Sequence, residues 1–398
     1  MMIKKYMPIA AITLFALTGC QSSGGASGAV AVTESPTLSA TASAAPTAPA
    51  PTPTAAPTTV PNKSTSSSNV SMSTITAVRL ADAKSGWIGG KGWIAHTNDG
   101  GTQWQVQYQG AGDAKQIFAL NGQDAWAVFG EEGKLVNTKD GGQHWASVGQ
   151  MPNAAFLHFV TKQEAFSGNA HTVDGGVKWT KMPVPEGTVG DAYFHDAKNG
   201  WAVKQVKDAI EVDRTQDGGK TWKAVLSRKS AVAPTGAVIR SAGADDAWVE
   251  LIGESGMTQT SYSLFHTKDG GKNWQTVLAN STAGGGPAPG FQAGDNTGPK
   301  NTGTKPGPLY VVSPDVAFMG GQCPSCDKPN SVGWTKDGGK TWVNGQESFT
   351  GYGELLLAMA DANHGWLLTN DTAQPSVMYT TTNGGVKWQK AHTFDAPK

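Results

Sequence analysis

The pattern of apolar and polar positions from about residue 74 onward predicts short β-strands separated by tight turns. A representative stretch has apolar runs at residues 116–120, 125–129, 134–138 and 144–148, with Gly- and Asp-containing segments between them. Runs of about five residues bounded by turn-forming residues are typical of strands and too short for amphipathic helices. The pattern therefore predicts an all-β domain whose repeating unit has four strands.

One eight-residue motif, Thr-x-Asp-Gly-Gly-x-x-Trp, defines the repeat and occurs seven times. The copies begin at Thr97, Thr138, Thr172, Thr215, Thr267, Thr335 and Thr381, and their third residues are Asp99, Asp140, Asp174, Asp217, Asp269, Asp337 and Asn383. A weaker motif, Gly or Ala followed by Trp or Phe, precedes each copy, with its aromatic residue at Trp87, Trp126, Phe166, Trp201, Trp248, Phe318 and Trp366.

The longer motif has the chemistry of a β-hairpin turn. Asp-Gly supplies the positive φ of a tight turn, and the Asp carboxylate can accept hydrogen bonds from the turn's own amides. None of these residues has a second acid two positions on, as a calcium loop would, so we expect them to be structural. Seven units of about 46 residues match the size of four-stranded propeller blades. We therefore predict a seven-bladed β-propeller over residues 74–398.

The last repeat contains its own fourth strand near residues 387–392. We therefore expect the ring to close by side-chain packing, with residues 70–75 as a candidate edge strand.

These motifs resemble the Asp-box, or bacterial neuraminidase repeat, and with the upstream Gly-Trp they resemble photosystem II stability/assembly-factor-like propellers. The resemblance implies the propeller fold, whereas its members serve as sialidases, xyloglucanases, sorting receptors and assembly factors. Sialidases grip a carboxylate with three arginines and carry an Arg-Ile-Pro signature. This chain has only Arg79, Arg214, Arg228 and Arg240, and it lacks that signature. In the assembly factors that these motifs resemble, an arginine-containing patch contacts the protein being assembled. Four arginines and zero net charge do not favour such a patch in this chain.

The N-terminus is similar to a bacterial lipoprotein signal peptide. Lys4 and Lys5 precede an apolar run of about eleven residues, which is too short to span a bilayer. The run ends in Leu-Thr-Gly-Cys, so we expect residues 1–19 to be removed and Cys20 to be acylated. The prediction is a lipid anchor on the extracytoplasmic side of a bacterial cell membrane.

Residues 20–73 are rich in Ser, Thr, Ala and Pro, and they hold too little apolar surface to offset the entropy of ordering. We expect a disordered tether. The whole chain has 31 basic and 31 acidic residues, which gives no field to attract nucleic acid. We expect a monomer that has no nucleic-acid partner.

Cys323 and Cys326 form the one local motif that could carry chemistry. A zinc site needs two more close ligands, and a redox pair belongs at the start of a helix, whereas this pair interrupts a blade. Outside the cytoplasm a disulfide is favoured, with reactive thiols and a metal site as the alternatives. No cofactor or resident metal is expected.

Long insertions indicate where a partner binds. In a four-stranded blade the motif turns lie on one face, and residues 250–261, 280–308 and 322–331 lie on the other. We expect Glu254, Phe291, Asp327, Lys328 and Asp371 to be accessible there. The predicted function is a non-catalytic binding or assembly scaffold for a membrane or cell-envelope protein or glycan. The alternative is an extracellular glycosidase, marked by acids and aromatic residues at the mouth of the central channel.

Overall fold

The described part of the chain consists of β-strands and turns. The computed structural model describes residues 62–63, 70–295 and 297–397, and no helix is assigned among them. It follows that none of these residues belongs to a helix that could cross a bilayer. The expected signal peptide and Cys20 lie outside the described residues, as does most of the expected tether.

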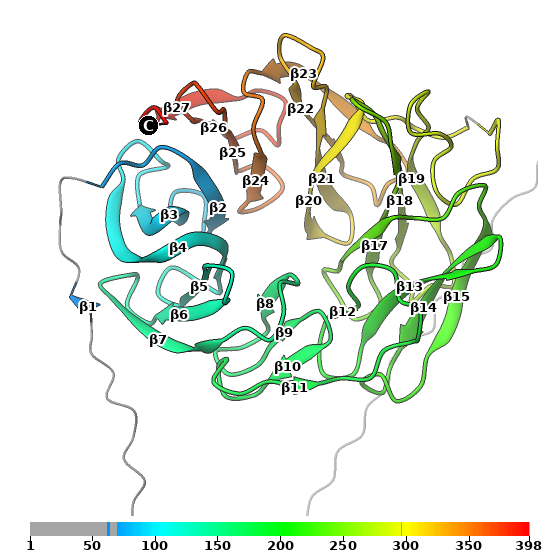
Figure 1. The fold of residues 1–398 in the computed structure, drawn as a ribbon, viewed down its shortest axis with the longest axis horizontal. Coiled ribbons are helices and arrows are strands. Elements are labelled where there is room, and N and C mark those ends of the chain that lie inside the picture. The colour runs from blue at the N-terminus through cyan, green and yellow to red at the C-terminus, as the bar shows by residue number, and fades with distance from the viewer. Residues whose placement is uncertain (1–61, 64–69, 296, 398) are drawn as a thin grey trace, which may run out of the picture. The chain divides into compact units, whose positions relative to one another are not determined.

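The strands form six sheets around a ring (Figure 1), so the prediction of seven separate four-stranded blades is wrong. One sheet has seven strands in the order β1-β7-β6-β5-β4-β3-β2. Its strands are β1 (Asn62–Lys63), β2 (Ile75–Leu80), β3 (Gly86–Thr97), β4 (Gln105–Ala119), β5 (Ala125–Phe129), β6 (Lys134–Thr138) and β7 (His144–Gln150).

The first two sequence repeats share this sheet because β4 is continuous over 15 residues. The first part of β4 pairs with β3 and its second part pairs with β5. The sequence prediction assigned these two repeats to separate blades, whereas the backbone remains in one strand through residues 110–112, where Gly112 has a φ of 80°.

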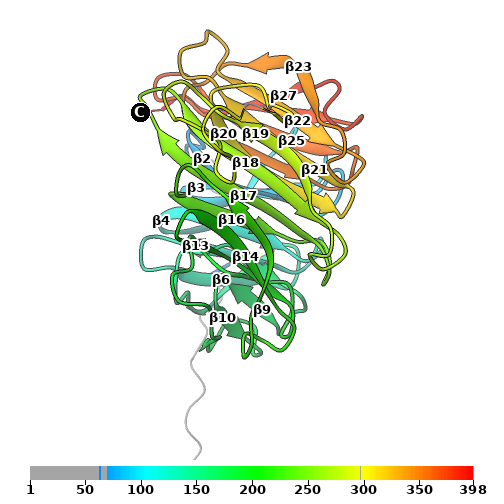
Figure 2. The same cartoon turned by 90° about the vertical axis from the view of Figure 1, so that its right-hand side faces the viewer.

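The other five sheets each contain four strands that follow one another along the chain. They are β8 (Leu157–Phe159) to β11 (Thr180–Lys181) through β9 (Ala165–Ser167) and β10 (Ala170–Thr172); β12 (Tyr193–Phe194), β13 (Gly200–Val206), β14 (Ala209–Thr215) and β15 (Lys223–Lys229); β16 (Gly236–Arg240), β17 (Ala247–Ser255), β18 (Thr260–Thr267) and β19 (Gln275–Asn280); β20 (Lys305–Ser313), β21 (Val316–Gln322), β22 (Asn330–Thr335) and β23 (Val343–Phe349); and β24 (Leu355–Met359), β25 (Gly365–Thr369), β26 (Val377–Thr381) and β27 (Gln389–Thr393). Figure 2 shows β16–β19 lying side by side in one such sheet.

Aromatic residues of the two motifs fill the space between neighbouring sheets. The tryptophans of the shorter motif are at most 1% exposed, namely Trp87, Trp126, Trp201, Trp248 and Trp366. The motif tryptophans that follow the turns pack across the sheet boundary. Trp274 meets Trp201 edge to face with ring centroids 6.2 Å apart. Each such ring removes a large apolar area from water and fixes one sheet against the next.

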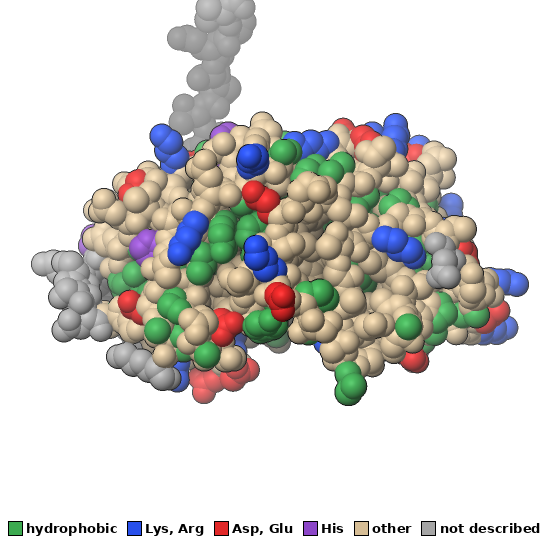
Figure 3. Space-filling view, turned by 90° about the horizontal axis from the view of Figure 1, so that it is seen from above, with side chains coloured by type: hydrophobic (Ala, Val, Ile, Leu, Met, Phe, Trp, Pro, Cys, Tyr) green, Lys and Arg blue, Asp and Glu red, His purple; other side chains and the backbone are tan. Residues whose placement is uncertain are grey.

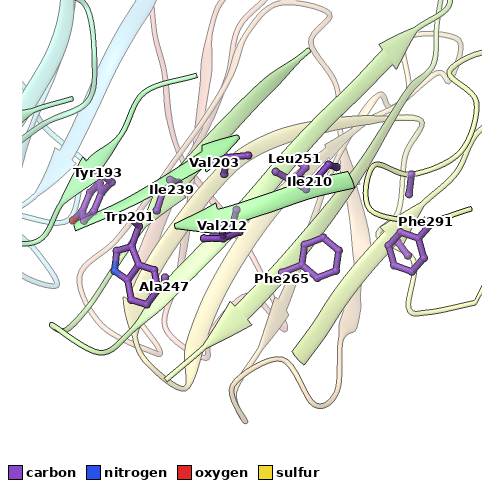
Figure 4. Close-up of a cluster of buried hydrophobic side chains, with 13 residues drawn as sticks. Tyr193, Trp201, Val203, Ile210, Val212, Ile239, Ala247, Leu251, Phe265 and Phe291 are labelled. Atoms are coloured by element: carbon purple, nitrogen blue, oxygen red, sulfur yellow. The ribbon is translucent and has the colours of Figure 1, made fainter. Parts of the chain in front are cut away.

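The cluster between the β12–β15 and β16–β19 sheets shows how this core is built (Figure 4). Val203, Val212 and Leu251 come from the strands themselves. Phe291 comes from the long connection between β19 and β20 and stacks on Phe265 at 5.9 Å. That connection is therefore part of the core and not only a surface loop.

The ring closes where the β24–β27 sheet meets the start of β2. The Ile75 amide donates to Asn370 Oδ1 at 3.1 Å, and Asn370 Nδ2 donates to the Ile75 carbonyl at 2.8 Å. The Met72 amide donates to Asp395 Oδ2, and the Asp395 amide donates back to the Met72 carbonyl. Residues 70–74 form no strand, so the candidate edge strand is not present and the two ends are held by these bonds and by packing.

Candidate functional site: the loop face and the central pocket

The seven Asp-Gly-Gly or Asn-Gly-Gly turns form closed hydrogen-bond networks. In the turn at Asp217, the Thr215 hydroxyl donates to Asp217 Oδ1 at 2.8 Å, and the Gly219 amide donates to the Thr215 hydroxyl at 2.9 Å. The Thr221 amide also donates to Asp217 Oδ1, and the hydrogen bond from the Thr221 hydroxyl lowers the pKa of Asp217 to about 2.

The same Thr-to-third-residue and Gly-to-Thr bonds recur in every copy. The third residues concerned are Asp99, Asp140, Asp174, Asp269, Asp337 and Asn383. These carboxylates, and the Asn383 amide, are thus engaged in their own turns. No group of three or more His, Cys, Asp or Glu side chains within the described residues is arranged to hold a metal ion.

Cys323 and Cys326 are joined by a disulfide in the loop between β21 and β22. The Cys326 amide donates to the Cys323 carbonyl, and the Cys323 amide donates to the Pro329 carbonyl. This loop is further held by the Tyr352 hydroxyl, which donates to the Cys326 carbonyl at 3.1 Å.

The structure places four of the five candidate binding residues at the surface. Glu254, Asp327 and Lys328 are exposed, and Asp371 is half-buried. Phe291 is only 4% exposed, so its prediction as an accessible residue is wrong. The reason is that its ring stacks on Phe265 and beneath the Arg228 guanidinium, which lies 4.9 Å from the ring centroid.

The segments that carry these residues are connected by hydrogen bonds into one surface, which we call the loop face: residues 253–260, 281–295, 297–304, 323–329, 350–354 and 370–376. The Thr304 hydroxyl donates to the Thr258 carbonyl, and the Thr304 amide donates to the Gln322 carbonyl. The Tyr352 amide donates to Asp371 Oδ2 at 3.1 Å. Asp371 therefore serves as an acceptor within the loop face.

Two apolar side chains on the loop face were missed by sequence analysis. Met257, at the tip between β17 and β18, is 98% exposed, and Tyr352 is 60% exposed. Nothing in the local sequence distinguishes them from buried residues, because their exposure depends on how the loops stack. Exposed Met and Tyr side chains are enriched at protein interfaces.

A second feature lies where the leading strands of the repeats converge at the centre of the ring (Figure 1). A pocket of about 370 Å³, which we call the central pocket, is lined from β2, β4, β8, β12, β16, β20 and β24 or residues directly beside them. Its walls are mostly aliphatic and aromatic, and its polar groups are Arg79, His158, His195, Arg240 and Ser241, with the Tyr193 and Tyr310 hydroxyls. No Asp or Glu lines it.

Two of the four arginines of the chain therefore meet in this pocket. The Arg79 guanidinium lies 4.6 Å from the Phe118 ring centroid and 5.8 Å from that of Tyr310. The Arg240 guanidinium lies 3.9 Å from the Phe156 ring centroid. Sequence analysis counted the arginines and found too few for a patch, but it could not see that two of them share one site.

Burial governs the protonation of the groups around Arg240. Desolvation lowers the pKa of His158 to about 4, so this histidine is neutral at pH 7. Its ring stacks on Tyr193 with centroids 4.9 Å apart. Desolvation raises the pKa of Tyr193 to about 12 and that of Glu250 to about 8, with Arg240 opposing both increases. Glu250 lies on β17 opposite Val238 of β16, outside the lining of the pocket.

Comparison with known proteins places the chain near one group of propellers. A family model described as "Photosynthesis system II assembly factor YCF48" matches residues 62–154. This part of the chain is similar to the Ycf48 assembly factors. The photosystem II assembly protein Ycf48 of Synechococcus sp. (strain JA-2-3B'a(2-13)) is 28% identical over 123 residues, which are 28% of this chain and 35% of that protein. The chain thus matches about a third of the length of this curated relative.

Two solved structures of YCF48 are similar in fold over most of this chain. YCF48 from Cyanidioschyzon merolae has a TM-score of 0.48 at 14% identity, covering 79% of this chain and 94% of that one. A structure described as YCF48 bound to D1 peptide has a TM-score of 0.46 at 14% identity, covering 79% and 92%. The family model and the Synechococcus relative support a likeness of this part of the chain to the photosystem II assembly factors.

Proposed function

We propose that this protein is a lipid-anchored, extracytoplasmic propeller that binds a protein partner on its loop face and catalyses no reaction itself. The observation that carries the proposal is the loop face, where hydrogen-bonded loops present Met257 and Tyr352 to solvent. The family model and the cyanobacterial relative, both described as photosystem II assembly factors, support a scaffold. The N-terminal sequence up to Cys20, which resembles a lipoprotein signal peptide, supports the lipid anchor and an extracytoplasmic location.

The charge distribution supports a partner recognised by shape and apolar contact. Over the side of the molecule seen in Figure 3, basic and acidic side chains are interspersed without a large patch of one sign. Such a surface does not attract a highly charged polymer. Rigid apolar anchors in a polar surround are the usual source of affinity in protein interfaces.

The glycosidase alternative needs a pair of carboxylates about 5 to 10 Å apart at the reacting bond. The central pocket offers aromatic walls but no lining carboxylate. The aspartates of six of the seven turns are held by amides and hydroxyls of their own turns. The geometry therefore favours the binding scaffold.

The test is affinity capture from detergent-solubilised membranes with the anchored protein as bait. Met257→Asp and Tyr352→Asp are compared with Val173→Asp, which changes an equally apolar residue, 69% exposed, beside the turn at Asp174. We expect one partner to be lost with the two loop-face variants and retained with Val173→Asp. Equal capture by all three variants would contradict the loop-face assignment. Absence of any captured protein, together with release of reducing sugar from envelope glycans, would replace the scaffold with the glycosidase.

The anchor is tested separately by Cys20→Ser. We expect this variant to leave the membrane fraction, because the acyl chains on Cys20 supply the membrane affinity. Retention of Cys20→Ser in washed membranes would contradict the lipid anchor.

A further inference from the structure

The central pocket has the size and lining of a small-ligand site. Ligand pockets are commonly about 300 to 1,000 Å³, mostly apolar, with a few convergent polar groups. The central pocket has a volume of about 370 Å³ and is walled by rings such as Phe118, Phe159 and Tyr310. It is distinct from the loop face, because none of the residues that line it belongs to those loops.

The two guanidiniums of the pocket have no carboxylate partner. Among the described residues neither Arg79 nor Arg240 has an acidic oxygen within 4.0 Å, whereas Arg214 forms an ion pair with Asp245. Arg79 Nε has no hydrogen-bond partner, and the hydrogen bond that Arg240 makes is from Nη1 to its neighbour's carbonyl, Ile239 O. Each guanidinium carries five N–H donors, so most of these donors are free for a ligand.

The aromatic rings beside the guanidiniums stabilise the two cations within the pocket. A guanidinium carries a planar, forked donor set, which matches a carboxylate in a bidentate manner.

His158 helps to shape the pocket. It lines the pocket, is 9% exposed, and stacks on Tyr193 with ring centroids 4.9 Å apart. Because burial keeps its imidazole neutral at pH 7, it adds no charge to the two guanidiniums.

We infer that the central pocket binds a small organic carboxylate, with the carboxylate held by Arg79 and Arg240 and an apolar or aromatic body lying against the ring-lined wall. An inorganic anion would leave this apolar wall uncovered. A neutral compound of the same shape would leave both guanidiniums without a counter-charge.

The inference is tested by isothermal titration calorimetry on the full-length protein in nanodiscs of zwitterionic lipid. The probes are phenylacetate, indole-3-acetate and octanoate, each paired with its primary amide, together with inorganic phosphate. We expect at least one carboxylate to bind with one-to-one stoichiometry and its amide to bind at least tenfold more weakly, since a charge-assisted pair contributes about 1.4 kcal/mol or more. Phosphate should show no stoichiometric binding.

Variants locate the site. Arg79→Gln and Arg240→Gln should each weaken the affinity for the carboxylate at least tenfold. Arg228→Gln is the matched control, because Arg228 also lies over two aromatic rings and has no ion pair within 4.0 Å in the described structure, but it does not line the pocket. The affinity of the Arg228→Gln variant for the carboxylate should stay within twofold of that of the wild type.

Several results would overturn the inference. They are the failure of all three carboxylates to bind at about 10 mM, equal binding of acid and amide, phosphate binding as tight as that of the best carboxylate, or equal losses in Arg228→Gln and the pocket variants. The acid–amide comparison uses the wild-type protein, so it decides the question even if a variant does not fold. The titration does not involve the partner of the loop face, so its outcome is separate from that of the capture experiment.

Discussion

Replacing Glu250 by Gln should remove a pH-dependent loss of stability. Glu250 is 3% exposed on β17, between Val238 of β16 and Leu264 of β18. Desolvation raises its pKa from the usual 4.5 to about 8, and attraction to Arg240 offsets part of this increase. Glutamine keeps the length of the side chain and cannot ionise.

The sign and size of the effect follow from proton linkage. Folded Glu250 keeps its proton up to about pH 8, whereas the unfolded chain loses it near pH 4.5. Between these values the folded state binds more protons, so the free energy of unfolding falls as pH rises, by up to about 1.4 kcal/mol per pH unit. The resulting decrease in the free energy of unfolding of the wild type is absent below pH 4.5, about 3 kcal/mol at pH 7 and about 5 kcal/mol above pH 8.

The assay is urea unfolding of the wild type and Glu250→Gln at steps from pH 5 to pH 9. We expect the free energy of unfolding of the variant to rise relative to that of the wild type from pH 5 to about pH 8 and the difference to level off by pH 9. Glu254→Gln is the control, because Glu254 is exposed on the same strand, and its stability should run parallel to that of the wild type. A constant difference between Glu250→Gln and wild type from pH 5 to pH 9 would refute the reasoning that burial holds this carboxyl neutral.

Three further predictions concern the fold. Gly100→Ala and Gly219→Ala both place a Cβ at a positive φ, but only at Gly219 would it meet a backbone oxygen, at 2.2 Å. Thermal unfolding should show a loss of about 1 kcal/mol for the first and about 2–4 kcal/mol for the second, and equal losses would contradict the steric argument. Phe291→Ala should cost about 3–5 kcal/mol in urea unfolding, and a loss below 1 kcal/mol would mean that the ring is not part of the core. Deleting residues 1–69 removes only the two-residue strand β1 from the described structure and should change the melting temperature little. Deleting residues 1–73 also removes bonds to Asp395 and Ser376 and should cost about 2–3 kcal/mol; equal melting temperatures of the two deletions would show that these bonds do not hold the ring closed.

The β-propeller could be predicted from the sequence because its repeats are local. The Asp-Gly-Gly turns and the buried tryptophans recur within about 46 residues, and each turn is satisfied by its own residues. The number of sheets could not be predicted in the same way. Whether residues 110–112 break β4 or continue it depends on pairing with β3, which no motif encodes.

The candidate site was predictable only in part. Asp327 and Lys328 could be placed on an exposed loop because they lie in a connection between two strands. Glu254 is exposed as expected, but it lies at the end of β17, which continues to Ser255 where a loop was predicted. Phe291 was wrongly assigned to the surface because Gly and Pro around it suggested a free loop, whereas Gly290 and Phe291 fold back onto Ser230 and Phe265. The central pocket combines residues from seven separate strands or directly beside them, so no local pattern could have indicated it.

The way in which the ring closes sets the order of folding. Within the described residues every paired strand except β1 joins its neighbour along the chain, so each sheet can form from a short, recently synthesised segment. The bonds of Asn370 to Ile75 and of Asp395 to Met72 instead span 295 and 323 residues. Bringing together residues this far apart in sequence costs about 5 kcal/mol of chain entropy. This cost falls once the intervening sheets have folded, because little flexible chain then remains between the two ends. Closure is therefore the last step, and a circularly permuted chain that joins the present ends and opens between two other sheets should fold to the same ring with its final step moved to the new opening.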